Sequence, residues 1–97
     1  MAGIKEFLQD NCRGQENAVT SKTLEGLFGC KGADIRRMVN DLRRSGVPIC
    51  SGRNGYYYAT RKNEITATIA HLEGRMAKIK AAQSGLLNSL SEQTQMR

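Results

Sequence analysis

The chain has 97 residues, enough for one small domain and an extended element but too few for a two-domain enzyme with a deep internal pocket. Hydrophobic residues make up 39% and charged residues 25% of the chain, as in ordinary folded proteins, so extensive disorder is not expected. The formal net charge is +6, and residues 31–62 alone carry eight basic against two acidic side chains, which indicates an anionic partner for that segment.

The N-terminal segment, MAGIKEFLQD, lacks the apolar core of a signal peptide, and no run of about 18 apolar residues occurs in the sequence. We therefore expect a cytoplasmic protein without a membrane partner. Apolar residues at positions 4, 7, 8 and 12 predict a short amphipathic helix that ends near Arg13 and Gly14. Ala18 and Val19 then form a candidate short strand.

A second helix is predicted to begin at Thr20 or Ser21, since either hydroxyl can accept a hydrogen bond from a free N–H of the first turn. Its expected buried stripe is Leu24, Leu27 and Phe28. Gly29 suits a left-handed helix end. About four residues separate this helix from the next, and so short a turn makes the two helices cross steeply, as in a helix-turn-helix unit.

Residues 31–44, KGADIRRMVNDLRR, predict a helix with two chemically different faces. The apolar face consists of Ile35, Met38, Val39 and Leu42. The opposite face centres on Ala33, Arg37, Asn40 and Arg44, with Arg36 and Arg43 on one flank and Asp34 and Asp41 on the other. The first face can be buried, whereas the second presents cations and an amide at a spacing that suits a DNA groove.

Two short strands are predicted after this helix, at residues 47–51 and 55–59. The pair Asn54 and Gly55 is a strong hairpin signal, because the favoured two-residue turn needs positive φ at both central residues. Arg53 would then stand at or beside the hairpin tip.

Alternation along these strands predicts which side chains share a face. Val47 and Ile49 should lie on one face of the first strand, and Tyr56 and Tyr58 on one face of the second, with Tyr57 turned outward. We interpret the three tyrosines as sheet packing and not as a platform for stacking bases.

From residue 63 the pattern becomes that of a long helix, which Asn63 or Thr60 could cap. Eight positions follow the a and d spacing of a heptad repeat: Ile65, Ile69, Leu72, Met76, Ile79, Gln83, Leu86 and Leu90. The polar member, Gln83, occupies an a position, where it lowers stability but helps to fix register. A helix so long and narrowly apolar needs a partner helix, so a homodimer is expected, parallel or antiparallel. Alternatively, the first turns pack on the chain's own domain and only the remainder dimerises.

Chemistry-bearing residues are sparse. Cys12, Cys30 and Cys50 form no CxxC pair, so we expect reduced packing residues and neither a disulfide framework nor a metal site. His71 has no second ligand at metal-binding spacing and should be solvated. The sequence has no glycine-rich phosphate loop, no nucleophile paired with a histidine, and no clustered carboxylates. We therefore expect no enzymatic activity and no cofactor.

A set of short motifs connects this order of elements to a known family. They are Leu27-Phe28-Gly29-Cys30 leading into Ala33-Asp34-Ile35, the spacing from Val39 to Leu42, Ser45-Gly46-Val47, and Gly55-Tyr56. With them, residues 24–60 resemble the N-terminal winged helix-turn-helix domain of the bifunctional biotin ligase and biotin-operon repressor family. The likeness covers a little under half of the chain. The sequence departs from the family after the hairpin, where a heptad helix follows and no ligase domain, so biotin chemistry is not implied. The compact layout also resembles small phage or prophage proteins.

The resemblance implies a mainly α fold with a small β-hairpin, of the α+β class. It implies a winged helix-turn-helix domain at residues 1–62, to which the heptad pattern adds a dimerisation helix at 63–91 and a frayed tail at 92–97. Residues 31–44 would be the recognition helix in the major groove and residues 52–55 the wing. The groove or phosphate contacts carried over are Lys31, Arg36, Arg37, Asn40 and Arg44, with Arg53 as the wing contact.

The expected function is sequence-specific binding of double-stranded DNA by a dimer, as a transcriptional regulator or a replication or excision accessory. Arginine pairs bidentately with guanine and asparagine with adenine, so Arg37 and Asn40 are predicted to read bases. The predicted phosphate contacts are Lys31, Arg36, Arg43, Arg44, Arg53 and Arg61. The alternative is a winged-helix adaptor that uses its C-terminal helix to assemble with a partner protein.

Overall fold

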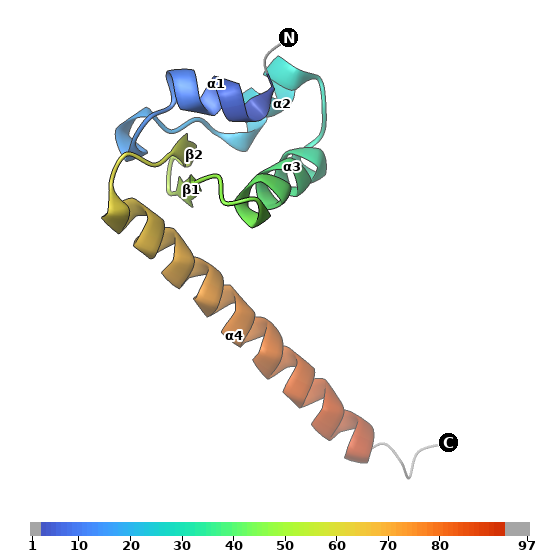
Figure 1. Cartoon of the computed structure of the whole chain (residues 1–97). Coiled ribbons are helices and arrows are strands. Elements are labelled where there is room, and N and C mark those ends of the chain that lie inside the picture. The colour runs from blue at the N-terminus through green and yellow to red at the C-terminus, as the bar shows by residue number, and fades with distance from the viewer. Residues whose placement is uncertain (1–2, 93–97) are drawn as a thin grey trace.

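The computed structural model describes residues 3–92, which contain four α-helices, one short 3₁₀ helix at Gln15–Asn17 and a two-stranded antiparallel hairpin. The three short helices, α1 (Ile4–Asn11), α2 (Ser21–Phe28) and α3 (Gly32–Arg44), gather with the hairpin at one end of the molecule. Helix α4 (Lys62–Glu92) extends away from them as a single rod (Figure 1). The predicted combination of a mainly helical chain, a small hairpin and a long C-terminal helix is therefore confirmed.

Helix α2 (Ser21–Phe28) begins and ends where local signals predict, and α1 (Ile4–Asn11) ends two residues before the predicted Arg13. The carboxylate of Glu6 accepts the Gly3 N–H at 3.0 Å at the start of α1. Of the two candidate caps of α2, Thr20 is the one used, and its hydroxyl accepts the Thr23 N–H at 3.2 Å. Gly29 ends α2 with φ 62°, the left-handed conformation expected of it.

Helix α3 (Gly32–Arg44) follows α2 after three residues and buries the predicted face. The side chain of Asp34 accepts the Lys31 N–H at 3.1 Å and so satisfies one free donor at the helix start. The main core is formed by Ile4, Leu8, Cys12, Leu24, Ile35, Val39 and Ile49, with Met38 and Leu42 packed against it. The amphipathic character predicted for α3 is confirmed.

Strands β1 (Ile49–Gly52) and β2 (Gly55–Tyr58) are each shorter than predicted. The hairpin turn differs from the predicted one, in which Asn54 and Gly55 would both have positive φ. Arg53 and Asn54 lie between the strands and neither has positive φ, whereas Gly55, the first residue of β2, has φ 117°. Gly55 is also fixed by crowding, since a Cβ on it would stand 2.1 Å from the Val19 carbonyl oxygen. The candidate strand at residues 18–19 is reduced to one bridge, in which Val19 and Tyr56 exchange hydrogen bonds of 2.8 and 2.9 Å.

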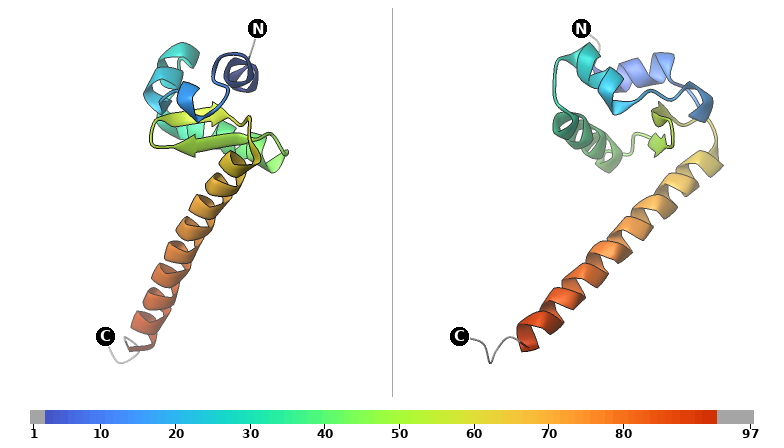
Figure 2. Two further views of the ribbon diagram at one scale, coloured as in Figure 1. Left: turned by 90° about the vertical axis from the view of Figure 1, so that its left-hand side faces the viewer. Right: turned by 180° about the vertical axis from the view of Figure 1, so that it is seen from behind.

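The hairpin is covered on both faces, which corrects the orientation expected for Tyr57. Tyr56 and Tyr58 pack against the main core, as their shared face predicts. Tyr57 lies on the other face but is only 3% exposed, in a second cluster with Cys50, Ala59 and Ile65. Figure 2 shows the hairpin between the three short helices and the first turns of α4. Tyr57 is therefore buried because α4 covers the face that alternation alone would leave to solvent.

Helix α4 (Lys62–Glu92) starts on a buried carboxylate that the sequence did not point to. One oxygen of Glu64 accepts the N–H groups of Thr60 at 2.9 Å and Arg61 at 3.2 Å, and the other accepts the Gln15 N–H at 2.9 Å. Glu64 is 7% exposed. The expectation that Thr60 or Asn63 caps this helix is wrong, because Glu64 makes the capping bonds and Asn63 lies inside the helix.

Only the first turns of α4 pack on the domain, which was the alternative to a helix that dimerises over its whole length. Glu64 and Thr68 are buried and Ile65 is half-buried. The large apolar residues beyond them are exposed: Ile69, Met76, Ile79, Leu86, Leu87 and Leu90. Gln83 is exposed too, and Leu72 is half-buried. The predicted tail from residue 93 onward lies outside the described residues. None of the helices within residues 3–92 has the length and apolarity needed to cross a membrane.

Candidate nucleic-acid interface

The face of α3 opposite the core is exposed and carries most of the predicted DNA contacts. These residues are Lys31, Arg36, Arg37, Asn40 and Arg44. The side chains of Lys31, Arg36 and Asn40 have no hydrogen bond or ion pair within residues 3–92. A ligand could therefore bind these three groups without first breaking a contact of the protein.

The two remaining arginines of this face are paired along the helix. Arg37 donates to Asp34 at 2.6 Å, and Arg44 forms a salt bridge with Asp41. The Arg37 and Arg44 side chains are 69% and 75% exposed, and pairs this exposed are worth only about 0.2–1 kcal/mol. Both guanidiniums can therefore exchange their carboxylate for another anion at little cost.

Arg43 has a different environment from its neighbours and holds α3 to β1. Its Nε donates to the Ile49 carbonyl at 2.7 Å and its Nη2 to the Ser51 hydroxyl at 3.2 Å. The side chain is half-buried, and burial lowers the pKa of the guanidinium, with the nearby cation Arg75 acting in the same direction and Tyr56 and Cys50 opposing it. Sequence reasoning predicted a phosphate contact here and missed this structural role.

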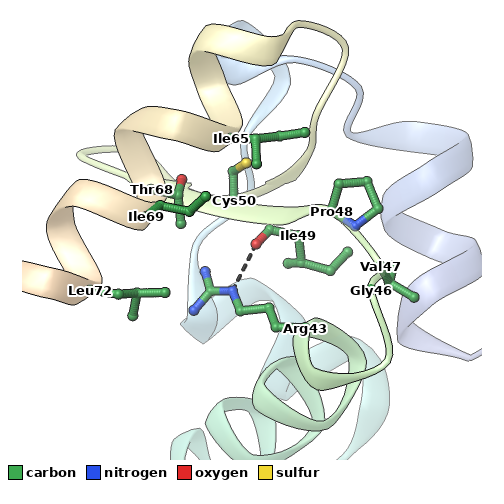
Figure 3. Close-up of a pocket in the computed structure, with 10 residues that line it drawn as sticks. All are labelled: Arg43, Gly46, Val47, Pro48, Ile49, Cys50, Ile65, Thr68, Ile69 and Leu72. Atoms are coloured by element: carbon green, nitrogen blue, oxygen red, sulfur yellow. Dashed lines mark hydrogen bonds between the residues drawn. The ribbon is translucent and has the colours of Figure 1, made fainter.

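A cavity of about 320 Å³ lies beside Arg43, between β1 and α4 (Figure 3). Its lining is mainly apolar: Val47, Pro48, Ile49, Ile65, Ile69 and Leu72. No acidic residue lines it. The apolar walls suit hydrocarbon groups and not a nucleotide.

A smaller cavity, also lined by Arg43, has residues of α3, the hairpin and α4 in its walls. It is about 50 Å³ and is lined by Arg36, Val39, Asn40, Arg43, Ser51, Tyr56 and Arg75. Arg75 was not singled out from the sequence. Its place beside α3 depends on the angle at which α4 leaves the hairpin, which no local pattern specifies. Asn40 remains exposed, with Arg75 of α4 on one side of it.

The other two predicted contacts lie apart from α3. Arg53 is exposed in the hairpin turn, where it lines a cavity of about 720 Å³ together with Asn54, Tyr57 and His71. Arg61 is exposed just before α4 begins. Within residues 3–92 no hydrogen bond joins either side chain to α3.

The three cysteines are free thiols, and burial raises the pKa of Cys12, in keeping with the packing role predicted for them. In residues 3–92 no group of three or more His, Cys, Asp and Glu side chains is arranged to hold a metal ion.

Comparison with protein-family models, curated proteins and solved structures gives no match. The structure itself defines the class: a small, mainly helical domain with a hairpin, a cationic face on α3 and a long C-terminal helix.

Proposed function

We propose that the protein binds double-stranded DNA sequence-specifically, with residues 1–62 acting as a winged helix-turn-helix domain. The observation that carries the proposal is the solvent face of α3, where cations and an amide stand opposite the buried Ile35 and Val39. A helix with side chains is about 10–12 Å across, which matches the roughly 12 Å width of the major groove. Helix α3 would be the recognition helix, and residues 52–55 the wing.

Phosphate neutralisation would supply most of the affinity, and base contacts the selectivity. We assign base reading to Arg37 and Asn40, because these side chains form bidentate pairs with guanine and adenine. The phosphate contacts would be Lys31, Arg36, Arg43, Arg44, Arg53 and Arg61. Arg43 would in addition hold α3 on β1. As a dimer through α4, the protein would serve as a transcriptional regulator or as a phage replication or excision accessory.

Binding measured against salt concentration tests this function. The logarithm of affinity should fall steeply with the logarithm of salt, by about 0.9 for each phosphate neutralised. Arg37→Ala should reduce the preference for the selected sequence, at a cost of about 1–3 kcal/mol. Arg53→Ala should weaken binding to all sequences alike. Lys22→Ala, which removes an exposed cation from α2, is the matched control and should change neither. Affinity that does not depend on salt would contradict DNA binding.

A second function is favoured by the exposed apolar residues of α4. Ile79, Leu86, Leu87 and Leu90 are each more than half exposed, and a partner protein could cover them in place of a second copy. In this case the domain would be an adaptor. Affinity capture from host lysate with and without nuclease separates the two functions, because only a protein partner is retained after the DNA is digested.

A further inference from the structure

Two arginines without an acidic partner face the small cavity between α3 and α4. Arg43 and Arg75 line it together with Asn40, Ser51 and Tyr56. No acidic residue lines the cavity, and neither arginine forms an ion pair within residues 3–92. Two cations beside one partly enclosed space repel each other, and an anion placed between them would remove that repulsion.

Two hydrogen bonds hold Arg43 in a fixed orientation and leave further N–H donors of its guanidinium unused. Its Nε and Nη2 bond to the Ile49 carbonyl and the Ser51 hydroxyl, while its Nη1 has no partner within residues 3–92. Figure 3 shows Nε of Arg43 bonded to the Ile49 carbonyl and the terminal nitrogens on the side on which Leu72 of α4 lies. A guanidinium fixed in this way can bind an oxyanion with little loss of side-chain entropy.

We propose that this cavity binds a phosphate group of the DNA backbone, held by Arg43 and Arg75 with the Asn40 amide beside them. The inference rests on the proposed function, because α3 must lie along the duplex to bring a phosphate here. About 10–15 Å³ holds one water molecule, so 50 Å³ leaves room for several oxygen atoms. Arg36 also lines the cavity, but its guanidinium lies near Gly32 at the start of α3. The distance from its Nη1 to the position of a Cβ built on Gly32 is 3.8 Å, so we do not include Arg36 in the phosphate site. Helix α4 would then contact DNA as well as carrying the exposed apolar stripe.

The test compares Arg75→Gln with Lys78→Gln. Both changes remove one cation from α4, but Lys78 does not line the cavity. With duplex DNA, Arg75→Gln should bind about tenfold more weakly than Lys78→Gln, on specific and scrambled sequences alike, and its salt slope should be smaller by about 1 than that of the unaltered protein. The same cavity should also respond to inorganic phosphate. Replacing chloride by phosphate at equal ionic strength should raise the melting temperature of the unaltered protein and of Lys78→Gln more than that of Arg75→Gln.

The possible results separate this inference from the proposed function. Equal behaviour of Arg75→Gln and Lys78→Gln in both measurements would overturn the phosphate site, while duplex binding by both variants would leave the proposed function standing. A phosphate effect that depends on Arg75, in a protein that binds no duplex, would overturn both the proposed function and the assignment to the DNA backbone. Such a result would point to a free phosphate compound.

Discussion

Glu64 connects two distant parts of the chain through one carboxylate. It accepts the N–H of Gln15, which lies 49 residues earlier, and the N–H groups of Thr60 and Arg61 beside it. The Thr60 bond, followed by the Gln15 bond, holds the pKa of Glu64 below its usual value of 4.5, although burial opposes this. The ionised carboxylate therefore stabilises both the start of α4 and its attachment to the domain.

This leads to a prediction about stability and pH. Because the folded pKa of Glu64 is depressed, its contribution is fully present above about pH 4.5 and is lost as the pH falls through the folded value. Glu64→Gln should lower the melting temperature by several degrees at pH 7, and the difference from the unaltered protein should shrink as the pH is lowered below 4. Thermal unfolding followed by circular dichroism between pH 3 and 7 measures this.

Glu73→Gln is the matched control, since Glu73 is exposed on α4 and has no hydrogen bond within residues 3–92. It should change the melting temperature little at any pH. If Glu64→Gln lost the same stability at pH 3 as at pH 7, the bonds of the ionised form would not be the cause.

Single residues were predictable from sequence where their partners are close in the chain. Thr20 and Gly29 act on backbone within their own helix, so composition and spacing were enough. Glu64 and Arg43 escaped prediction because their partners lie on other elements, at Gln15 and Ile49. The charge of such a residue is visible in the sequence, but its burial follows only from the packing of the elements.

At the scale of elements, the helices were predicted well because their apolar period is repeated over several turns. The hairpin was less predictable. Alternation placed Tyr57 opposite Tyr56 and Tyr58, but it gave no information about what covers that face. The heptad pattern located α4 without showing where its contact with the domain ends. That boundary is set by the angle between α4 and β1, and the first exposed seam residue is Ile69.

The exposed stripe of α4 leads to a prediction about assembly. Met76, Ile79 and Leu86 are each about two-thirds exposed or more, and a second copy of α4 would bury them. We expect a dimer at micromolar concentration, and Ile79→Asp should convert it to a monomer because a carboxylate would enter the apolar seam. Sedimentation equilibrium or light scattering measures the mass.

Ala81→Asp is the control for this prediction. Ala81 is exposed on the same helix but lies outside the heptad seam, so the variant adds the same charge and should remain a dimer. A monomeric mass for the unaltered protein across the concentration range would contradict dimerisation and would favour the adaptor function.

At the scale of the whole molecule, the proposed DNA face and the apolar stripe lie on different elements joined by the first turns of α4. Glu64 and Thr68 are buried in this junction, and Arg75 stands beside α3 about two turns after Thr68. Dimerisation through the far part of α4 would therefore fix the distance and angle between two α3 helices. A pair of recognition helices placed in this way would require two half-sites at a defined spacing.

The last prediction follows from this coupling between assembly and DNA binding. Two linked DNA-binding domains bind a duplex with two half-sites more tightly than one domain does, commonly by a factor of about 10²–10⁴. Ile79→Asp should therefore reduce affinity for the paired site to nearly that for a single half-site and roughly halve the salt slope, while Ala81→Asp should retain the affinity and slope of the unaltered protein. Fluorescence anisotropy on duplexes with one or two half-sites measures both quantities. If Ile79→Asp is monomeric and still binds the paired site as tightly as the dimer, α4 does not couple the two DNA-binding domains. The exposed apolar residues of α4 must then bind another partner.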